Sequence, residues 1–343
     1  MRNYISKVKE KQHLTYEEME EVANVLFSED AASADIEEFL IALSEKGETA
    51  LEIAALASVM RTFANNVEVP LGSFMDNCGT GGDGTNSFNV STTTAFVLAG
   101  AGAKVAKHGN RKVSSAAGSS DVLEALGIRL DFTSEEISEL LEKEGITFLY
   151  APNVHPKMKR IGAIRQKIGK RTIFNLVGPL TNPIPLSTQF AGISLSDFTM
   201  EYATALHMLG RQRAIVVAGA EGMDEASLSG QNSFVLLDRG DLIPFSLTAE
   251  DVGLTSAPIS SIIGGDANEN AEILRSILKG ERGPRFDTVV FNAGIGLFAN
   301  GQAETIAEGV HQATESILSG AAYQKLEAVI AFSAKVSEKV VVN

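Results

Sequence analysis

A loop rich in glycine is the first part of the chain whose residues could do chemistry. Residues 79–84 read GTGGDG, which matches the dinucleotide-binding pattern G-x-G-x-x-G literally. Glycines at this density let the backbone approach a ligand closely and point its amides at an anion. Asn89, Ser91 and Thr92 follow at the expected start of a helix, where unpaired N–H groups favour a phosphate. The loop is therefore a candidate phosphate site, and a plain glycine turn before a helix is the alternative.

The residues around this loop disfavour two well-known nucleotide sites. A dinucleotide fold needs its last glycines to open the helix and an acidic residue about 20 positions later. Here the helix is expected to begin near Ser91, and the next strand ends in the basic run KHGNR at 107–111. A P-loop needs a lysine inside the loop, and this loop has none. A dehydrogenase built on G-x-G-x-x-G is therefore disfavoured.

Two long segments lack acidic residues although the whole chain is acidic. One lies between Asp83 and Asp121, the other lies between Glu144 and Asp197, and both contain several lysines and arginines. Such segments indicate that an anion is bound between them. Most lysines of the second segment would serve equally as a solvated helix face, so Arg165 is the residue that we expect to be functional.

Two neighbouring carboxylates, Asp224 and Glu225, stand in a loop after a predicted strand. Adjacent carboxylates without a nearby histidine or cysteine suit a hard ion such as Mg²⁺. Zinc is disfavoured, because the chain has neither H-E-x-x-H nor paired cysteines. An acidic pair in a loop is usually only surface, but beside a phosphate site it predicts bound Mg²⁺. Asp83 would repel a phosphate unless it faces a sugar hydroxyl or a metal-bound water.

The composition limits the class of protein. Among 343 residues, 29 Lys and Arg stand against 43 Asp and Glu, and the net charge of −14 disfavours nucleic acid and anionic membranes as partners. The single cysteine, Cys78, cannot form an internal disulfide, and no run of about 18 apolar residues could span a bilayer. The first residues lack the apolar stretch of a secretory signal. We therefore expect a cytoplasmic protein.

The order of elements predicts an α/β fold with a small helical domain at 1–69 and a larger α/β domain at 70–343. In the first part apolar residues recur at helical spacing, and Thr15 with Glu18 and Thr49 with Glu52 match the capping box. Beyond it, short apolar runs alternate with helix-length segments, which indicates a mostly parallel central sheet. Strands are predicted at 103–109, 146–152, 189–194, 213–220, 233–238 and 287–294, and helices at 91–102, 133–145, 201–210 and 270–280.

With these features in place, the chain resembles the anthranilate phosphoribosyltransferases of tryptophan biosynthesis over nearly its whole length. The resemblance is carried by GTGGDG and SFNVST (79–84, 87–92), KHGNRKVSS (107–115), DVLEALG (121–127), HP (155–156), RQKIGKRTIFNLVGPLTNP (165–183), GMDE (222–225) and GGDANENAEIL (264–274). Each motif is short, but their order and spacing together are specific. Small departures are Ser87 in place of the usual threonine, AAGSS at 116–120 and GQN at 230–232. The first keeps a hydroxyl, and the others affect loop geometry.

The resemblance implies a nucleoside phosphorylase/phosphoribosyltransferase-like fold whose helical domain is completed by part of 160–187 and mediates a homodimer. It implies that the phosphoribosyl group of phosphoribosyl pyrophosphate passes to the amine of anthranilate, giving N-(5-phosphoribosyl)anthranilate and pyrophosphate. The residues implied for phosphoribosyl pyrophosphate are Gly79, Gly82, Asp83, Ser87, Asn89, Val90, Ser91, Thr92, Lys107, His108, Gly109, Asn110, Arg111, Ser114, Ser115 and Ser119. Those implied for anthranilate are Gly79, His108, Asn110, His155, Arg165 and Gly178, and those for Mg²⁺ are Ser91, Asp224 and Glu225.

The expected chemistry is displacement at C1 of the ribose, with positive charge on the sugar ring while pyrophosphate leaves. Stabilising the leaving group is then the main demand. His108 and His155 are candidates for a general base, and shaping the acceptor pocket is the alternative. A pyrimidine nucleoside phosphorylase, which shares the architecture and a related K-H-G motif, is the nearest rival function. A non-catalytic relative that binds nucleic acid is a second rival, which the acidic net charge and the intact acidic pair disfavour.

Overall fold

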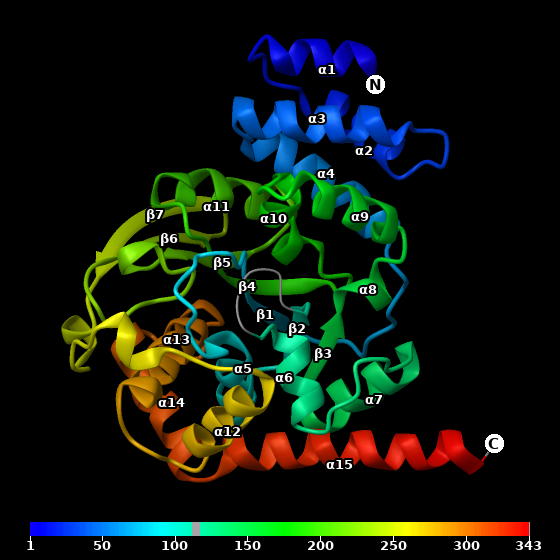
Figure 1. Ribbon diagram of the computed structural model, residues 1–343. Coiled ribbons are helices and arrows are strands. Elements are labelled where there is room, and N and C mark those ends of the chain that lie inside the picture. Colours follow the sequence, from blue (N-terminus) through cyan, green and yellow to red (C-terminus); the bar gives the residue numbers. More distant parts are fainter. Residues whose placement is uncertain (112–116, 343) are drawn as a thin grey trace.

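A group of helices at the N-terminus packs against one end of a larger body, in which helices surround a sheet (Figure 1). The structure is a computed structural model, and it describes residues 1–111 and 117–342. The N-terminus lies in the helical part, and the C-terminal helix runs along the opposite end of the body.

Four helices form the N-terminal part, which we call the helical bundle. They are α1 (Arg2–Lys9), α2 (Tyr16–Leu26), α3 (Ser33–Lys46) and α4 (Ala50–Thr62). The side chains of Thr15 and Thr49 accept hydrogen bonds from the N–H groups of Glu18 and Glu52, so both predicted capping boxes are confirmed. The apolar residues that recur at helical spacing are buried between the helices, as the sequence predicts.

A buried ion pair joins the end of α3 to the start of α4. Lys46 Nζ lies 2.9 Å from Glu52 Oε2, and the two side chains are only 1% and 0% exposed. Glu52 also accepts the N–H groups of Leu14 and Thr49, and Lys46 donates to the Gly47 carbonyl. Each charge therefore has a counter-charge and further hydrogen bonds, which a buried ion pair needs in order to be tolerated.

Seven strands form one sheet in the order β3-β2-β1-β4-β5-β6-β7. They are β1 (Phe74–Gly79), β2 (Val105–Gly109), β3 (Ile146–Tyr150), β4 (Leu186–Gly192), β5 (Arg213–Ala218), β6 (Asn232–Asp238) and β7 (Asp241–Leu247). The strands from β3 to β5 in this order are parallel, and β6 and β7 pair antiparallel. The α/β class and the mostly parallel sheet are confirmed. The parallel strands bring their carboxyl ends to one edge, where ligands bind in such folds.

Helices cover both faces of the sheet (Figure 1). They are α5 (Val90–Gly100), α6 (Ser119–Ala125), α7 (Ser134–Glu144), α8 (Ala151–Val154), α9 (Met158–Ile168), α10 (Ile173–Val177), α11 (Thr199–Met208), α12 (Ala267–Leu278), α13 (Pro284–Ala299), α14 (Ile306–Leu318) and α15 (Ala321–Val342). Short 3₁₀ turns are η1 (Gly178–Thr181), η2 (Ser196–Phe198), η3 (Ala220–Gly222), η4 (Glu250–Val252) and η5 (Ile259–Ile262). The helices formed by the described residues include none that is long and apolar enough to cross a membrane.

The sequence predicts β2 to β6 and helices α5, α7, α11 and α12 correctly, but its predicted strand at 287–294 is wrong. These residues lie inside α13, which begins at Pro284. Residues 288–294 are all buried, so no polar face reveals a helical period, and a fully buried apolar run reads equally as a strand. The sequence also missed two strands. β1 runs directly into the glycine loop, and β7 is mostly exposed and contains Pro244, which is tolerated at a sheet edge.

Two apolar cores hold these layers together. One fills the space between the sheet and the group of helices that includes α5, α13 and α15. The other begins inside the helical bundle and continues through α9, α10 and α11 to the opposite face of the sheet. Arg61 of α4 also donates from Nε to the Leu180 carbonyl over 2.9 Å. The bundle is thereby attached to residues 173–181, which line the cavity described below.

Replacement of Glu52 by Gln should lower the free energy of unfolding by about 3–5 kcal/mol, because it leaves the Lys46 ammonium buried without a counter-charge. Urea denaturation measures this loss. Glu38→Gln is the matched control, since Glu38 pairs with Lys9 on the surface of the same bundle. That exposed pair should contribute less than about 1 kcal/mol. Equal losses in the two variants would contradict a special role for the buried pair.

Candidate active site

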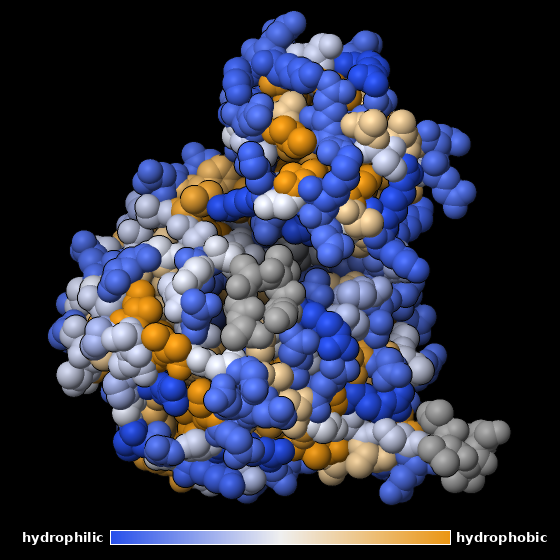
Figure 2. All heavy atoms as spheres, viewed as in Figure 1, coloured by the Kyte–Doolittle hydropathy of each residue, from blue (hydrophilic) through white to orange (hydrophobic). Residues whose placement is uncertain are grey.

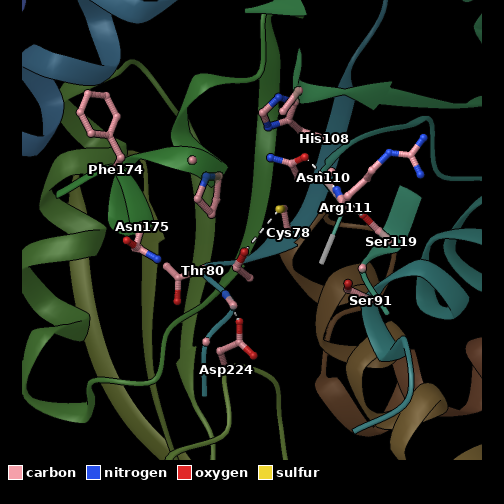
Figure 3. A pocket seen from close by; sticks show the side chains of 18 of the residues that line it. Cys78, Thr80, Ser91, His108, Asn110, Arg111, Ser119, Phe174, Asn175 and Asp224 are labelled. Atoms are coloured by element: carbon pink, nitrogen blue, oxygen red, sulfur yellow. Dashed lines mark hydrogen bonds between the residues drawn. The ribbon is translucent and has the colours of Figure 1, made fainter. Parts of the chain in front are cut away.

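A cavity of about 770 Å³ opens at the carboxyl ends of β1 and β2 (Figure 3). The predicted site residues that line it are Gly79, Gly82, Asp83, Ser87, Asn89, Ser91, Lys107, His108, Gly109, Asn110, Arg111, Ser119, His155, Arg165, Gly178, Asp224 and Glu225. Val90 and Thr92 are buried and are not part of this lining. Ser114 and Ser115 lie outside the described residues. The fold therefore gathers into one cavity residues that come from five separate stretches of the sequence.

The glycine loop crosses the carboxyl end of β1 in a tight turn. Positive φ angles, which favour glycine, occur at Gly81 (69°), Gly82 (77°) and Gly84 (76°). The Gly81 N–H donates to Asp224 Oδ2 over 2.6 Å. Thr85 donates its N–H and its hydroxyl to the Asp83 carboxylate, which fixes that side chain within the loop. The Gly81 N–H thus points at the Asp224 carboxylate, and binding of a phosphate by this loop stays a prediction.

The first turn of α5 presents its N–H groups beside this loop. Asn89 is the N-cap residue, and the Ser91 N–H donates to Glu225 Oε1 over 3.3 Å. The side-chain amide of Asn77, on β1, donates to the Ser91 carbonyl over 2.8 Å and so holds the turn in place. Asn89 Oδ1 is buried without a hydrogen-bond partner among the residues that the structure describes. A helix N-terminus in this position attracts anions.

The loop that carries Asp224 and Glu225, which we call the acidic corner, rests directly on the ends of three neighbouring strands. Glycines occupy those ends: Gly79 of β1, Gly192 of β4 and Gly219 just after β5. A Cβ at Gly192 would lie 1.6 Å from the Asp224 carbonyl oxygen, and a Cβ at Gly219 would lie 2.0 Å from the Glu225 carbonyl oxygen. Backbone contact with these glycines therefore sets where the two carboxylates stand.

The carboxylates at this corner are destabilised by one another. Burial, with a further contribution from Asp83, raises the pKa of Asp224 to about 7. Burial and the charges of Asp224 and Asp83 raise the pKa of Glu225 well above its ordinary value. A bound cation would remove this repulsion. The oxygen ligands that the Asp224 and Glu225 carboxylates and the Ser91 hydroxyl offer are those that Mg²⁺ prefers.

The described residues include no group of three or more Asp, Glu, His or Cys side chains arranged to hold a metal on their own.

A buried lysine lies at the floor of the cavity. Lys107 is 2% exposed, and its Nζ donates to the Asn77 carbonyl over 3.3 Å. Asp76 lies nearby and accepts hydrogen bonds from the His108 N–H (3.3 Å) and the Asn182 side chain (2.9 Å). Burial raises the pKa of Asp76 to about 6, although the Lys107 charge acts in the opposite direction. These bonds connect β1 to β2 and to the residue that follows η1.

Another part of the lining is a recess bordered by two histidines. The rings of His108 and His155 meet edge to face with centroids 5.4 Å apart. Burial lowers the pKa of His108 to about 3 and that of His155 to about 4, so both rings are neutral at pH 7. A histidine with so low a pKa is a weak base. The structure therefore favours a role for this pair in shaping the recess over a role as general base.

Arg165 reaches the same cavity from α9. Its guanidinium donates to Asn175 Oδ1 over 3.2 Å and lies 5.7 Å from the centre of the Phe174 ring. Burial alone lowers its pKa, and no acidic side chain in the described parts of the chain offsets that shift. A partly buried guanidinium without a counter-charge is suited to bind a carboxylate of a ligand.

The segment after β2 contributes its backbone and one amide side chain. Ser119 Oγ accepts the N–H of Asn110 and donates to its carbonyl, which fixes this turn. The Arg111 guanidinium extends away from the acidic corner (Figure 3), bonds to Glu124 and Asp121, and lies over the Tyr150 ring. Arg111 therefore reaches the cavity with its backbone, while its charge is engaged elsewhere.

Sequence reasoning missed several residues that build this site. Gly192 and Gly219 each lie near the end of a predicted strand, and a glycine at that place was an available sign of close backbone approach. Asp76 and Asn182 gave no such sign, because 106 residues separate the two partners. Phe174 and Asn175 lie within the motif at 165–183, but no pattern in the sequence indicates a role for them.

Two family patterns match the chain. The pattern described as "Glycosyl transferase family, helical bundle domain" matches residues 2–64, and "Glycosyl transferase family, a/b domain" matches residues 71–323. The helical bundle and the α/β body thus correspond to separate patterns within one family of glycosyl transferases.

Individual proteins resemble the chain over nearly its whole length. An anthranilate phosphoribosyltransferase from Exiguobacterium sibiricum is 58% identical over 95% of this chain and 96% of its own. A solved anthranilate phosphoribosyltransferase from Thermus thermophilus is 41% identical, with a TM-score of 0.91 over 96% of this chain and 99% of that one. The Saccharomyces cerevisiae enzyme in complex with PRPP and Mg is 28% identical, with a TM-score of 0.88 over 97% of each chain. The chain therefore belongs to the anthranilate phosphoribosyltransferase family.

Proposed function

We propose that this protein transfers the phosphoribosyl group of phosphoribosyl pyrophosphate to the amine of anthranilate and releases pyrophosphate, with Mg²⁺ as its metal. The observation that carries the proposal is the cavity itself. It joins the glycine loop, the α5 N-terminus and the acidic corner to a recess that holds the Arg165 guanidinium, which has no acidic partner among the described residues. The names of the relatives support it, and so does the yeast complex with PRPP and Mg.

On the donor side, we assign the diphosphate to the space between residues 79–92 and the acidic corner. The glycine-loop amides, the first turn of α5 and Lys107 supply fixed positive charge there before the reaction begins. Such preorganised charge stabilises negative charge that grows on the leaving group. Mg²⁺, when bound by Asp224, Glu225 and Ser91, would add charge neutralisation for pyrophosphate.

On the acceptor side, we assign the carboxylate of anthranilate to Arg165 and its aromatic ring to the neutral recess beside His108 and His155. Asn110 and Gly178 border the same space. A guanidinium that pairs with the carboxylate fixes the orientation of the ring and brings the amine toward C1 of the ribose. In the reaction the C1–O bond to pyrophosphate breaks, the N–C1 bond forms, and the nitrogen loses one proton to the departing pyrophosphate or to solvent.

The direct test is the loss of anthranilate fluorescence on incubation with the protein. The loss should require both phosphoribosyl pyrophosphate and Mg²⁺. Release of free base from thymidine or uridine in the presence of phosphate, without consumption of anthranilate, would instead support a pyrimidine nucleoside phosphorylase.

Removal of either carboxylate at the acidic corner should impair use of Mg²⁺. We expect Asp224→Ala and Glu225→Ala each to lower kcat and to raise the Mg²⁺ concentration for half-maximal rate by about 10-fold or more. In the unsubstituted protein the same concentration should rise as pH falls through about 7, because protons compete with the metal for Asp224. Steady-state rates over a Mg²⁺ series at several pH values measure both effects.

Glu221→Gln is the matched control for these substitutions. Glu221 is an exposed acid in the turn just before the acidic corner, so its loss should leave the Mg²⁺ requirement unchanged. If turnover and its dependence on Mg²⁺ both survive in Asp224→Ala and Glu225→Ala, the metal assignment is wrong.

Arg165→Ala should raise the KM for anthranilate by on the order of 30-fold, the loss expected when a charged hydrogen-bond partner is removed. The KM for phosphoribosyl pyrophosphate should change little. Lys167→Ala is the control, because Lys167 lies on the same helix but is 71% exposed and pairs with Glu37. Equal increases in both KM values for Arg165→Ala would place Arg165 on the phosphate side.

We also propose that residues 1–69 with part of 160–187 form a domain that mediates a homodimer, and that 70–343 form the second domain. Packing of α3 against α9 and of α4 against α10 supports this grouping. Ile41 and Leu51 are 38% and 44% exposed on the bundle, and the face of the bundle that Figure 2 shows has hydrophobic groups among hydrophilic ones. Light scattering should give twice the chain mass, and Ile41→Glu should reduce it. A single-chain mass at every protein concentration would contradict the dimer.

We propose a cytoplasmic location, in keeping with a single cysteine that remains free. The net charge of −14 disfavours nucleic acid and anionic membrane as partners.

A further inference from the structure

A second, much smaller cavity lies beneath the acidic corner. Its volume is about 10 Å³. The residues that border it are Asn77, Cys78 and Gly79 of β1, Ser91 and Thr94 of α5, Phe190 and Gly192 of β4, Asp224 and Glu225 of the acidic corner, and Asn292 of α13. It shares Cys78, Gly79, Ser91, Asp224 and Glu225 with the main cavity. Its lining includes apolar groups such as the Phe190 ring, and polar groups of Asn77, Thr94, Glu225 and Asn292 also border it.

Two of these groups lack hydrogen bonds. Asn77 Oδ1 and Thr94 Oγ1 are shielded from solvent and have no partner among the described residues, and the two residues are 2% and 0% exposed. The Asn77 amide nitrogen is held by the Ser91 carbonyl, so the amide oxygen has a defined direction. Buried polar atoms are nearly always paired with protein or with ordered water, because an unmade hydrogen bond costs free energy.

The other polar groups at this cavity already have partners. Asn292 accepts the Ala226 N–H and donates to the Ala226 and Thr288 carbonyls, so its amide is fully used. Among the hydrogen bonds of the described residues, Glu225 Oε1 accepts the Ser91 N–H over 3.3 Å. A carboxylate can accept several hydrogen bonds. The groups at this cavity that can still make hydrogen bonds therefore include the Asn77 side-chain oxygen, the Thr94 hydroxyl and the Glu225 carboxylate.

We propose that one water molecule occupies this cavity and bridges Asn77, Thr94 and Glu225. The volume corresponds to one water, and buried waters typically make about three hydrogen bonds. The water donates one proton to Asn77 Oδ1 and the other to the Glu225 carboxylate, and it accepts the Thr94 hydroxyl proton. Each of the two water protons and the Thr94 hydroxyl proton then has an acceptor.

This water makes Asn77 and Thr94 positioning residues for Glu225. It supports the carboxylate from the interior, while the Ser91 N–H holds Oε1. Groups that hold a metal ligand through hydrogen bonds commonly change metal affinity by about 10–100-fold when they are removed. This part of the inference rests on the proposed Mg²⁺ site, whereas the water itself does not.

A high-resolution crystal structure of the unsubstituted protein, grown without Mg²⁺ or substrates, tests the water directly. We expect a single peak within hydrogen-bond distance of Asn77 Oδ1, Thr94 Oγ1 and the Glu225 carboxylate. An empty cavity would overturn the proposal, and so would a peak with the short oxygen distances of a bound Na⁺.

Substitutions of Thr94 test the positioning role. Thr94→Val replaces the hydroxyl with a methyl group of similar shape, so it should remove the water and raise the Mg²⁺ concentration for half-maximal rate by about 10-fold. Thr94→Ser keeps the hydroxyl and should retain both the water and the original Mg²⁺ requirement. The KM for anthranilate should be unchanged in both variants, because the recess lies elsewhere.

Thr288→Val is the matched control. It also removes a buried helical hydroxyl, which bonds to the Pro284 carbonyl and does not border this cavity. It should therefore leave the Mg²⁺ requirement unchanged. An unchanged requirement in Thr94→Val, or an equal rise in Thr288→Val, would overturn the positioning role.

The two experiments separate this inference from the proposed function. If the crystal shows the water but the protein does not consume anthranilate, the proposed function fails and the water site stands. If the protein is an active Mg²⁺-dependent transferase and the cavity is empty, the water site fails and the function stands.

Discussion

Close backbone contact between the acidic corner and three strand-end glycines is the constraint on which the rest of the site depends. Any side chain at Gly192 or Gly219 would overlap backbone atoms of Asp224 or Glu225, and one at Gly79 would overlap the Asp224 side chain. Only with all three glycines present can the corner lie against the sheet edge. There it meets the glycine loop through the Gly81 amide and α5 through the Ser91 amide.

That arrangement places negative charge where the proposed function needs an anion to bind. Asp83, Asp224 and Glu225 lie close to one another. Burial, with the neighbouring negative charges as a second cause, raises the pKa values of Asp224 and Glu225. The same carboxylates would repel a diphosphate, so the site needs a cation as well as the α5 N-terminus and Lys107. Mg²⁺ meets this requirement, because its charge opposes both the carboxylates and the phosphate. The metal and the diphosphate are thus expected to bind cooperatively.

The two sides of the cavity are connected by buried hydrogen bonds. Asp76 joins β1 to the His108 amide and to Asn182, and Arg61 joins the helical bundle to the Leu180 carbonyl. The short stretch between α10 and β4 therefore receives bonds from the sheet and from the bundle. Because this stretch borders the recess beside Arg165, both parts of the protein position that recess at once.

The sequence by itself determined the elements and the kinds of chemistry, because these depend on local patterns. Helical spacing and capping boxes predicted the bundle, and glycines before a helix start predicted an anion site. Only the tertiary structure decided that residues 288–294 are helical, since a fully buried run has no polar face to reveal its period. It also decided which carbonyls lie on Gly192 and Gly219, and which buried atoms of Asn77 and Thr94 find no hydrogen-bond partner within the described parts of the chain. Such contacts join residues far apart in the chain, and no local pattern encodes them.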